Sequence, residues 1–115
     1  MIRTLITIFL LFNTSSSFNM NNHIYYIPID NTICYTNSDN YLHSIPDYKR
    51  INKINKLYKN GCKINYWCNR NEITGKNWSY FTERQLKIWG VYYSEILMYT
   101  PSHNYDKNID FDNII

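Results

Sequence analysis

The chain has 115 residues, a formal net charge of +3 at pH 7 and an aromatic fraction of 17%, most of it from twelve tyrosines. Its length suits one small domain with a thin hydrophobic core. Three glycines and three prolines are too few for a collagen-like chain or a flexible linker.

The first segment has the order of a secretory signal peptide. Arg3 supplies one positive charge, the apolar stretch Thr4–Phe12 follows, and a polar run over 13–17 closes it. We therefore expect a signal peptide over residues 1–17, cleaved before Phe18, and a secreted, extracellular protein. The apolar stretch is far shorter than the roughly 20 residues that cross a bilayer. The alternative is an uncleaved signal anchor that leaves the protein membrane-anchored.

Three stretches of the expected globular domain, residues 18–100, read as short strands. Ile24–Ile29 and Thr32–Thr36 are rich in strand-forming residues, and Pro28 favours a sheet edge for the first of them. Cys62–Cys68 alternates apolar and polar side chains, as a half-buried strand does.

Two helices are expected between and after these strands. Asp47–Lys59 places apolar residues at helical spacing with lysines on the other face, and Asn60-Gly61 suits the end of that helix. Asn-Gly is also a strong hairpin signal, which leaves a hairpin as the alternative. A second helix is expected to begin at Thr82, where Thr82 and Gln85 match a capping box. Its apolar face would hold Leu86, Trp89, Tyr93, Ile96 and Leu97.

These elements predict an α+β fold. We expect one small domain with about two helices and three or four short antiparallel strands. A polar, acidic tail over residues 101–115 would follow it.

The chain has three cysteines, Cys34, Cys62 and Cys68, and their pairing depends on the cellular compartment of the protein. A secreted protein is expected to form a disulfide, and the odd count leaves one thiol over. If Cys62–Cys68 is a strand, its two ends lie about 20 Å apart, too far for a bond. We therefore expect Cys34 to pair with Cys62 or Cys68, although a tight loop would allow Cys62 to pair with Cys68. The spacing does not fit a zinc site, and we expect no metal and no cofactor.

The charge of the chain is divided unevenly along it. Residues 49–87 hold ten lysines and arginines against Glu72 and Glu83, whereas the segments on either side are acidic. This basic segment fits either an anionic partner or pairing with the acidic ends. The candidate binding residues are Arg50, Lys53, Lys56, Lys59 and Lys63.

Two further sites follow from short motifs. Asn77-Trp78-Ser79 is an acceptor for N-glycosylation in a secretory pathway, which makes Asn77 a candidate glycan site. The histidines offer the alternative of a ribonuclease-type hydrolase, with His43 and His103 as base and acid. Lys63 or Lys87 would then stabilise the phosphorane.

We expect a small secreted binding or effector protein without enzymatic activity. Its partner would be a protein, a glycan or an anionic surface, and the sequence has no strong nucleic-acid signal. The unpaired cysteine would allow a disulfide-linked homodimer. The alternatives are the hydrolase and a membrane-tethered structural or assembly protein.

Overall fold

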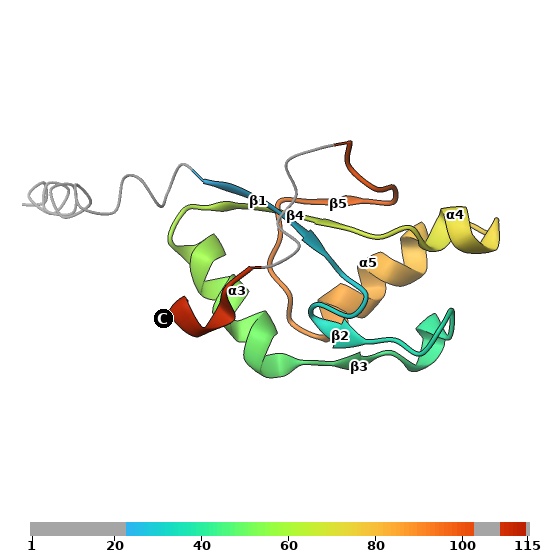
Figure 1. Ribbon diagram of the computed structural model, residues 1–115, viewed down its shortest axis with the longest axis horizontal. Helices are drawn as coiled ribbons and strands as arrows, with labels where there is room; N and C mark the ends of the chain where they lie inside the picture. Colours follow the sequence, from blue (N-terminus) through green and yellow to red (C-terminus); the bar gives the residue numbers. More distant parts are fainter. Residues whose placement is uncertain (1–22, 103–108, 115) are drawn as a thin grey trace, which may run out of the picture.

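The computed structural model describes residues 23–102 and 109–114, and a three-stranded sheet forms its centre (Figure 1). The sheet order is β1-β4-β5, and both neighbouring pairs are parallel. The strands are β1 (Ile24–Pro28), β4 (Lys63–Trp67) and β5 (Glu95–Leu97). The expected signal peptide over 1–17 lies outside the described residues.

The parallel sheet shows that the predicted antiparallel strands were wrong. Parallel strands need a long crossover between them, usually a helix, and the chain supplies one each time. α3 (Tyr48–Lys59) lies between β1 and β4, and α5 (Ser79–Ile88) lies between β4 and β5. Each strand alternates with a helix, and that order produces a parallel sheet. The expected edge position of β1 is confirmed.

Antiparallel pairing occurs in a second, much smaller sheet. There β2 (Cys34–Tyr35) pairs with β3 (Ile45–Pro46), and the 3-10 helix η2 (Tyr41–His43) lies between them. A short helix that the sequence did not predict, α4 (Arg70–Thr74), follows β4 directly. These small elements gather around the carboxyl ends of β1 and β4 (Figure 1).

Both longer helices lie on the same side of the sheet (Figure 1). Alternate residues of β4 point to that side, so that Ile64 and Tyr66 are completely buried. The core that they join also contains Ile27, Ile51, Ile54, Leu57, Leu86, Trp89 and Val91. Removal of this apolar surface from water is the main stabilising force of the fold.

The helix expected over Asp47–Lys59 is confirmed. The side chain of Asp47 accepts a hydrogen bond from the backbone N–H of Arg50 at 3.1 Å, so Asp47 caps the amino end. Asn60 is the C-cap, and Gly61 follows with a φ of 99°. Asn60-Gly61 therefore ends a helix and does not form a hairpin.

The prediction of the second helix was partly wrong. α5 begins three residues before the predicted cap, so that Thr82 is buried inside the helix. It ends at Ile88 with Trp89 as its C-cap, because Gly90 adopts a φ of 73° that breaks the helical path. Ile96 and Leu97, which the prediction placed on the same helix, belong to β5.

The C-terminal residues return to the core. Ile109, Phe111 and Ile114 pack against it. The 3-10 helix η3 (Phe111–Asn113) lies beside α3, where the chain ends in Figure 1. Among the described residues, no helix has both the length and the apolarity to cross a membrane.

Candidate functional site

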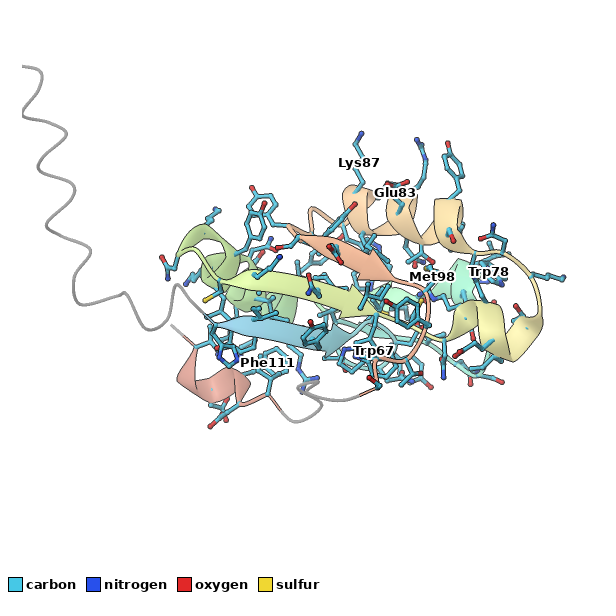
Figure 2. All side chains as sticks on the ribbon, turned by 90° about the horizontal axis from the view of Figure 1, so that it is seen from above. Trp67, Trp78, Glu83, Lys87, Met98 and Phe111 are labelled. Atoms are coloured by element: carbon cyan, nitrogen blue, oxygen red, sulfur yellow. The ribbon has the colours of Figure 1, made fainter. Side chains whose placement is uncertain are left out.

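The carboxyl ends of β1 and β4 form one candidate site, because ligands of open parallel sheets bind outside the carboxyl ends of the strands. Asp30 follows β1, and Cys68, Asn69 and Arg70 follow β4. Figure 2 shows this end of the sheet at the labelled Trp67 and Met98. A pocket of about 260 Å³ lies here, lined by Pro28, Asp30, Asn31, Ser38, Tyr41, Trp67, Cys68, Asn69 and Ile73.

An ion pair between Asp30 and Arg70 is the centre of this site. Arg70 Nε donates to Asp30 Oδ2 at 2.9 Å, and Arg70 Nη2 donates to Asp30 Oδ1 at 2.8 Å. The Arg70 side chain is completely buried, whereas that of Asp30 is 19% exposed. Two parallel hydrogen bonds of this kind are the strong form of the arginine–carboxylate interaction.

The rest of the Arg70 guanidinium joins two further segments, α5 and η2, to the pair. Its Nη1 donates to Thr82 Oγ1 at 3.0 Å and to Gln85 Oε1 at 2.8 Å, both on α5. The ring of Tyr41 in η2 lies 4.7 Å from its central carbon. Burial lowers the pKa of Arg70, but the hydrogen bonds and charge of Asp30 outweigh it and raise that pKa. Arg70 therefore stays charged.

Both oxygens of the Asp30 carboxylate accept hydrogen bonds from protein groups. Besides Arg70, the Thr36 hydroxyl donates to its Oδ1 at 2.7 Å, and the Cys34 thiol lies 3.8 Å from the same oxygen. A general base or nucleophile needs a lone pair directed at its substrate. Here the carboxylate instead joins the end of β1 to the β2 region and to α4.

The expected disulfide is not formed, because each of Cys34, Cys62 and Cys68 is a buried thiol that is not bonded to another cysteine. Cys62 and Cys68 stand at opposite ends of β4, which supports the argument that they cannot bond to each other. The Cys34 thiol hydrogen-bonds to the Ile29 carbonyl at 3.5 Å, and the Cys68 thiol lies 3.8 Å from the sulfur of Met98. Burial raises the pKa of all three thiols.

The residues of the hydrolase alternative do not gather at this site. His43 is exposed in η2, and its ring Nδ1 lies 2.9 Å from Asn40 Oδ1. His103 lies outside the described residues. Lys63 begins β4 at the opposite end from this pocket, and Lys87 projects from α5 away from the sheet (Figure 2). Within the described part of the chain, no group of His, Cys, Asp and Glu could hold a metal ion.

No family model matches this chain, and no curated protein matches it. One solved structure does. It is the crystal structure of a structural-genomics target from Vibrio cholerae, with a TM-score of 0.62 and 22% sequence identity. The match covers 76% of this chain and 79% of the other. At this identity, the similarity shows a shared fold.

Two of the five predicted binding residues turn out to hold the C-terminal segment. The Lys53 ammonium donates to the Phe111 carbonyl at 2.6 Å. The Arg50 guanidinium lies 4.5 Å from the centre of the Phe111 ring and donates to the Thr32 carbonyl at 3.1 Å. Both side chains are therefore used within the fold.

The other three, Lys56, Lys59 and Lys63, are exposed at the other end of the sheet from the Asp30 pocket. Lys56 and Lys59 are neighbours on the last turns of α3, and Lys63 begins β4. Two tyrosine rings accompany them. Lys59 lies 5.2 Å from the ring centre of Tyr92, which is 5.8 Å from that of Tyr58.

We call Lys56, Tyr58, Lys59, Lys63 and Tyr92 the basic edge. A shallow pocket of about 540 Å³ opens beside it, lined by His23, Ile24, Tyr58, Gly61, Cys62, Lys63 and Ser94. The sequence identified the lysines from their charge. It did not identify Tyr92, which is 29 positions beyond Lys63 and is held beside α3 by Asn55, whose Oδ1 accepts from the Tyr92 N–H at 2.9 Å.

The sequence also missed Asp30 and Arg70. An acid just after one strand and an arginine just after the next would have been the signal, but it has meaning only if the strands are parallel.

Asn77, the predicted glycan acceptor, is exposed in the turn before α5, and its side chain accepts a hydrogen bond from the Ser79 N–H at 2.9 Å. Its glycosylation stays a prediction.

Proposed function

We propose that this protein is a non-enzymatic binding domain that holds a sulfated glycan at the basic edge. The observation that carries the proposal is the meeting of exposed lysines with tyrosine rings at one end of the sheet. Lys59 and Tyr92 are in contact there, and Lys63 stands at the start of the adjacent strand. Sulfate groups would pair with the ammonium groups.

The tyrosines support a glycan over a simple inorganic anion. A tyrosine ring offers apolar bulk with a polar tip, which suits the apolar faces and hydroxyls of a sugar. Tyr58 and Tyr92 are 39% and 43% exposed, so both rings remain available beside the lysines. A partner carrying sulfates on a sugar backbone would use both kinds of group.

The absence of enzymatic activity is part of the proposal, and the engagement of Asp30 supports it. Arg70 and Thr36 hydrogen-bond to the Asp30 carboxylate. This carboxylate lies at the carboxyl ends of the strands, where ligands of parallel sheets bind. Secretion, with cleavage after residue 17, also remains part of the proposal. It would bring the basic edge to the extracellular space, where sulfated glycans are exposed.

Salt-dependent retention on a heparin column tests the proposal. The triple variant Lys56→Ala, Lys59→Ala, Lys63→Ala removes three charges from the basic edge. A matched variant, Lys49→Ala, Lys76→Ala, Lys87→Ala, removes three exposed charges elsewhere. We expect the basic-edge variant to elute at clearly lower salt than the matched variant, which elutes close to the parent protein.

A carboxymethyl column separates glycan recognition from simple net charge. Both triple variants should lose similar retention on it, because both lose three charges. Equal shifts of the two variants on heparin would overturn the proposal. Thermal unfolding of each variant shows that it has folded before its retention is compared.

A further inference from the structure

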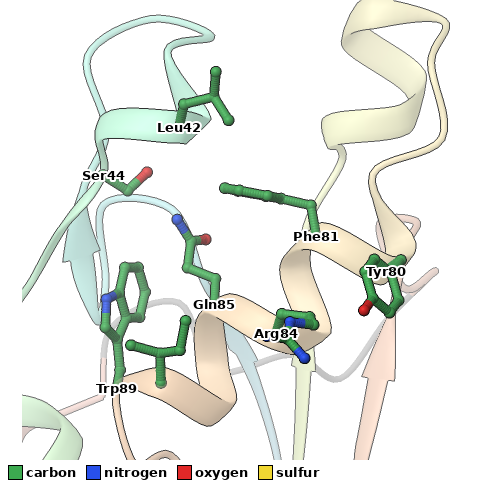
Figure 3. Close-up of a pocket in the computed structure, with 8 residues that line it drawn as sticks. Leu42, Ser44, Tyr80, Phe81, Arg84, Gln85 and Trp89 are labelled. Carbon is green, nitrogen blue, oxygen red and sulfur yellow. The ribbon is translucent and has the colours of Figure 1, made fainter.

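A third pocket, separate from the basic edge and from the Asp30 pocket, lies between η2 and α5 (Figure 3). Its volume is about 380 Å³, within the range of small-molecule sites. The lining residues are Leu42, Ser44, Tyr80, Phe81, Arg84, Gln85, Ile88 and Trp89. Most of them are aromatic or aliphatic.

The pocket has a buried floor and an unusually exposed rim. Gln85 and Trp89 are only 8% and 9% exposed. Leu42, Tyr80 and Ile88 are 63%, 72% and 73% exposed, the highest values among the large hydrophobic side chains that the structure describes. Apolar side chains around a concave floor typify a binding site, because a ligand would remove them from water.

Two neutral polar side chains of the lining, Gln85 and Ser44, are hydrogen-bonded within the protein. Gln85 Oε1 accepts from Arg70, and Gln85 Nε2 donates to the Tyr41 carbonyl at 3.0 Å. The Ser44 hydroxyl lies 2.7 Å from the Thr36 hydroxyl. These contacts fix the floor of the pocket, because the Gln85 amide makes its hydrogen bonds within the protein.

Arg84 is the one charged residue in the lining. Among the described residues it makes no ion pair, and its guanidinium carbon lies 5.7 Å from the ring centre of Tyr80. Figure 3 shows the Phe81 ring directed across the pocket, with Trp89 on the far side and Arg84 on the same helix. The pocket therefore offers aromatic walls and one unpaired positive charge.

We infer that this pocket binds a small aromatic organic anion. Its ring system packs between Phe81 and Trp89, and its carboxylate, sulfonate or sulfate pairs with Arg84. Ile88 and Leu42 cover it at the rim. The complementary charge and the pocket volume favour this class over a neutral or strongly polar ligand.

Two related fluorescent probes test the inference on the whole protein. The probes are 8-anilino-1-naphthalenesulfonate and N-phenyl-1-naphthylamine, which share the aromatic system but differ in the sulfonate. We expect saturable binding of one anionic probe per chain. Arg84→Gln should weaken the anionic probe about five-fold, as expected for loss of one partly exposed ion pair, and leave the neutral probe unchanged.

Three controls assign the probe to this pocket. Lys87→Gln removes a neighbouring charge of α5 that does not line the pocket and should change neither affinity. Ile88→Asp should weaken both probes, because it places a charge on the apolar rim. The basic-edge triple variant should bind the anionic probe as the parent does.

Several results would overturn the inference. They are no saturable binding of the anionic probe, equal effects of Arg84→Gln and Lys87→Gln, or a loss of anionic-probe affinity in the basic-edge variant. The last result would place the anion at the basic edge. Urea unfolding of each variant distinguishes a local effect on binding from a loss of structure.

Discussion

At the scale of single residues, the buried pair of Asp30 and Arg70 shows how two charged side chains can hold a fold together. Burial penalises both ions, and their mutual hydrogen bonds, together with those to Thr36, Thr82 and Gln85, offset that penalty. The two residues are 40 positions apart, so nothing local in the sequence links them. The parallel pairing of β1 and β4 brings them together.

Replacement of Arg70 by methionine should therefore be costly. Arg70→Met leaves the Asp30 carboxylate largely buried without its counter-charge, and we expect a loss of about 3–5 kcal/mol in the free energy of unfolding. Denaturant unfolding measures this. Arg84→Met is the matched control at an exposed arginine, and a change within about 0.5 kcal/mol is expected there.

A double-mutant cycle tests whether the pair itself is responsible. Asp30→Asn alone should also destabilise, because it leaves the Arg70 charge buried. The double variant Asp30→Asn, Arg70→Met should lose clearly less than the sum of the two single variants. Additive losses would contradict the account, since they would mean that the two side chains act independently.

The cysteines give a second prediction at the residue scale. None of the three takes part in a disulfide, so the denatured, non-reduced protein should react with Ellman's reagent at three thiols per chain. The folded protein should react slowly at pH 8, because burial blocks access and raises the pKa of each thiol. Reaction of the denatured protein at a single thiol would reveal a disulfide.

At the scale of elements, the helices differ in how far their sequence predicts them. α3 was predicted nearly to the residue because its apolar spacing and its stop, Asn60-Gly61, are local signals. The apolar spacing around α5 ran on through Ile96 and Leu97, although those residues belong to β5. Periodicity alone cannot separate a helix from a following strand when both bury the same face.

Gly90 is the residue that divides α5 from β5. An alanine here would keep the positive φ of 73° but suffer from a Cβ in the left-handed region, even though nothing lies within 4 Å. We expect Gly90→Ala to lower the free energy of unfolding by about 1–2 kcal/mol. Gly90→Asn should cost less, because asparagine tolerates that conformation. Thermal unfolding of the two variants measures the difference, and an Asn variant no more stable than the Ala variant would contradict it.

At the scale of the whole molecule, the sequence predicted one small domain of mixed helices and strands but not the direction of its sheet. Strand direction depends on how the crossovers pack, and the sequences of strands of three to five residues contain little information about that direction. The basic segment was visible as charge. The sequence did not show which lysines bind within the fold and which stay exposed, because Phe111, whose carbonyl accepts from Lys53, lies 58 positions away.

The most direct test of the central claim is the salt dependence of binding to a heparin-derived octasaccharide, measured by titration calorimetry between 50 and 200 mM NaCl. If Lys56, Lys59 and Lys63 pair with sulfates, the plot of log affinity against log salt should become shallower by about one unit for each lysine removed, as for phosphate contacts. The parent protein and the Lys49, Lys76, Lys87 triple variant should share the steeper slope. The same slope in all three proteins would contradict the claim.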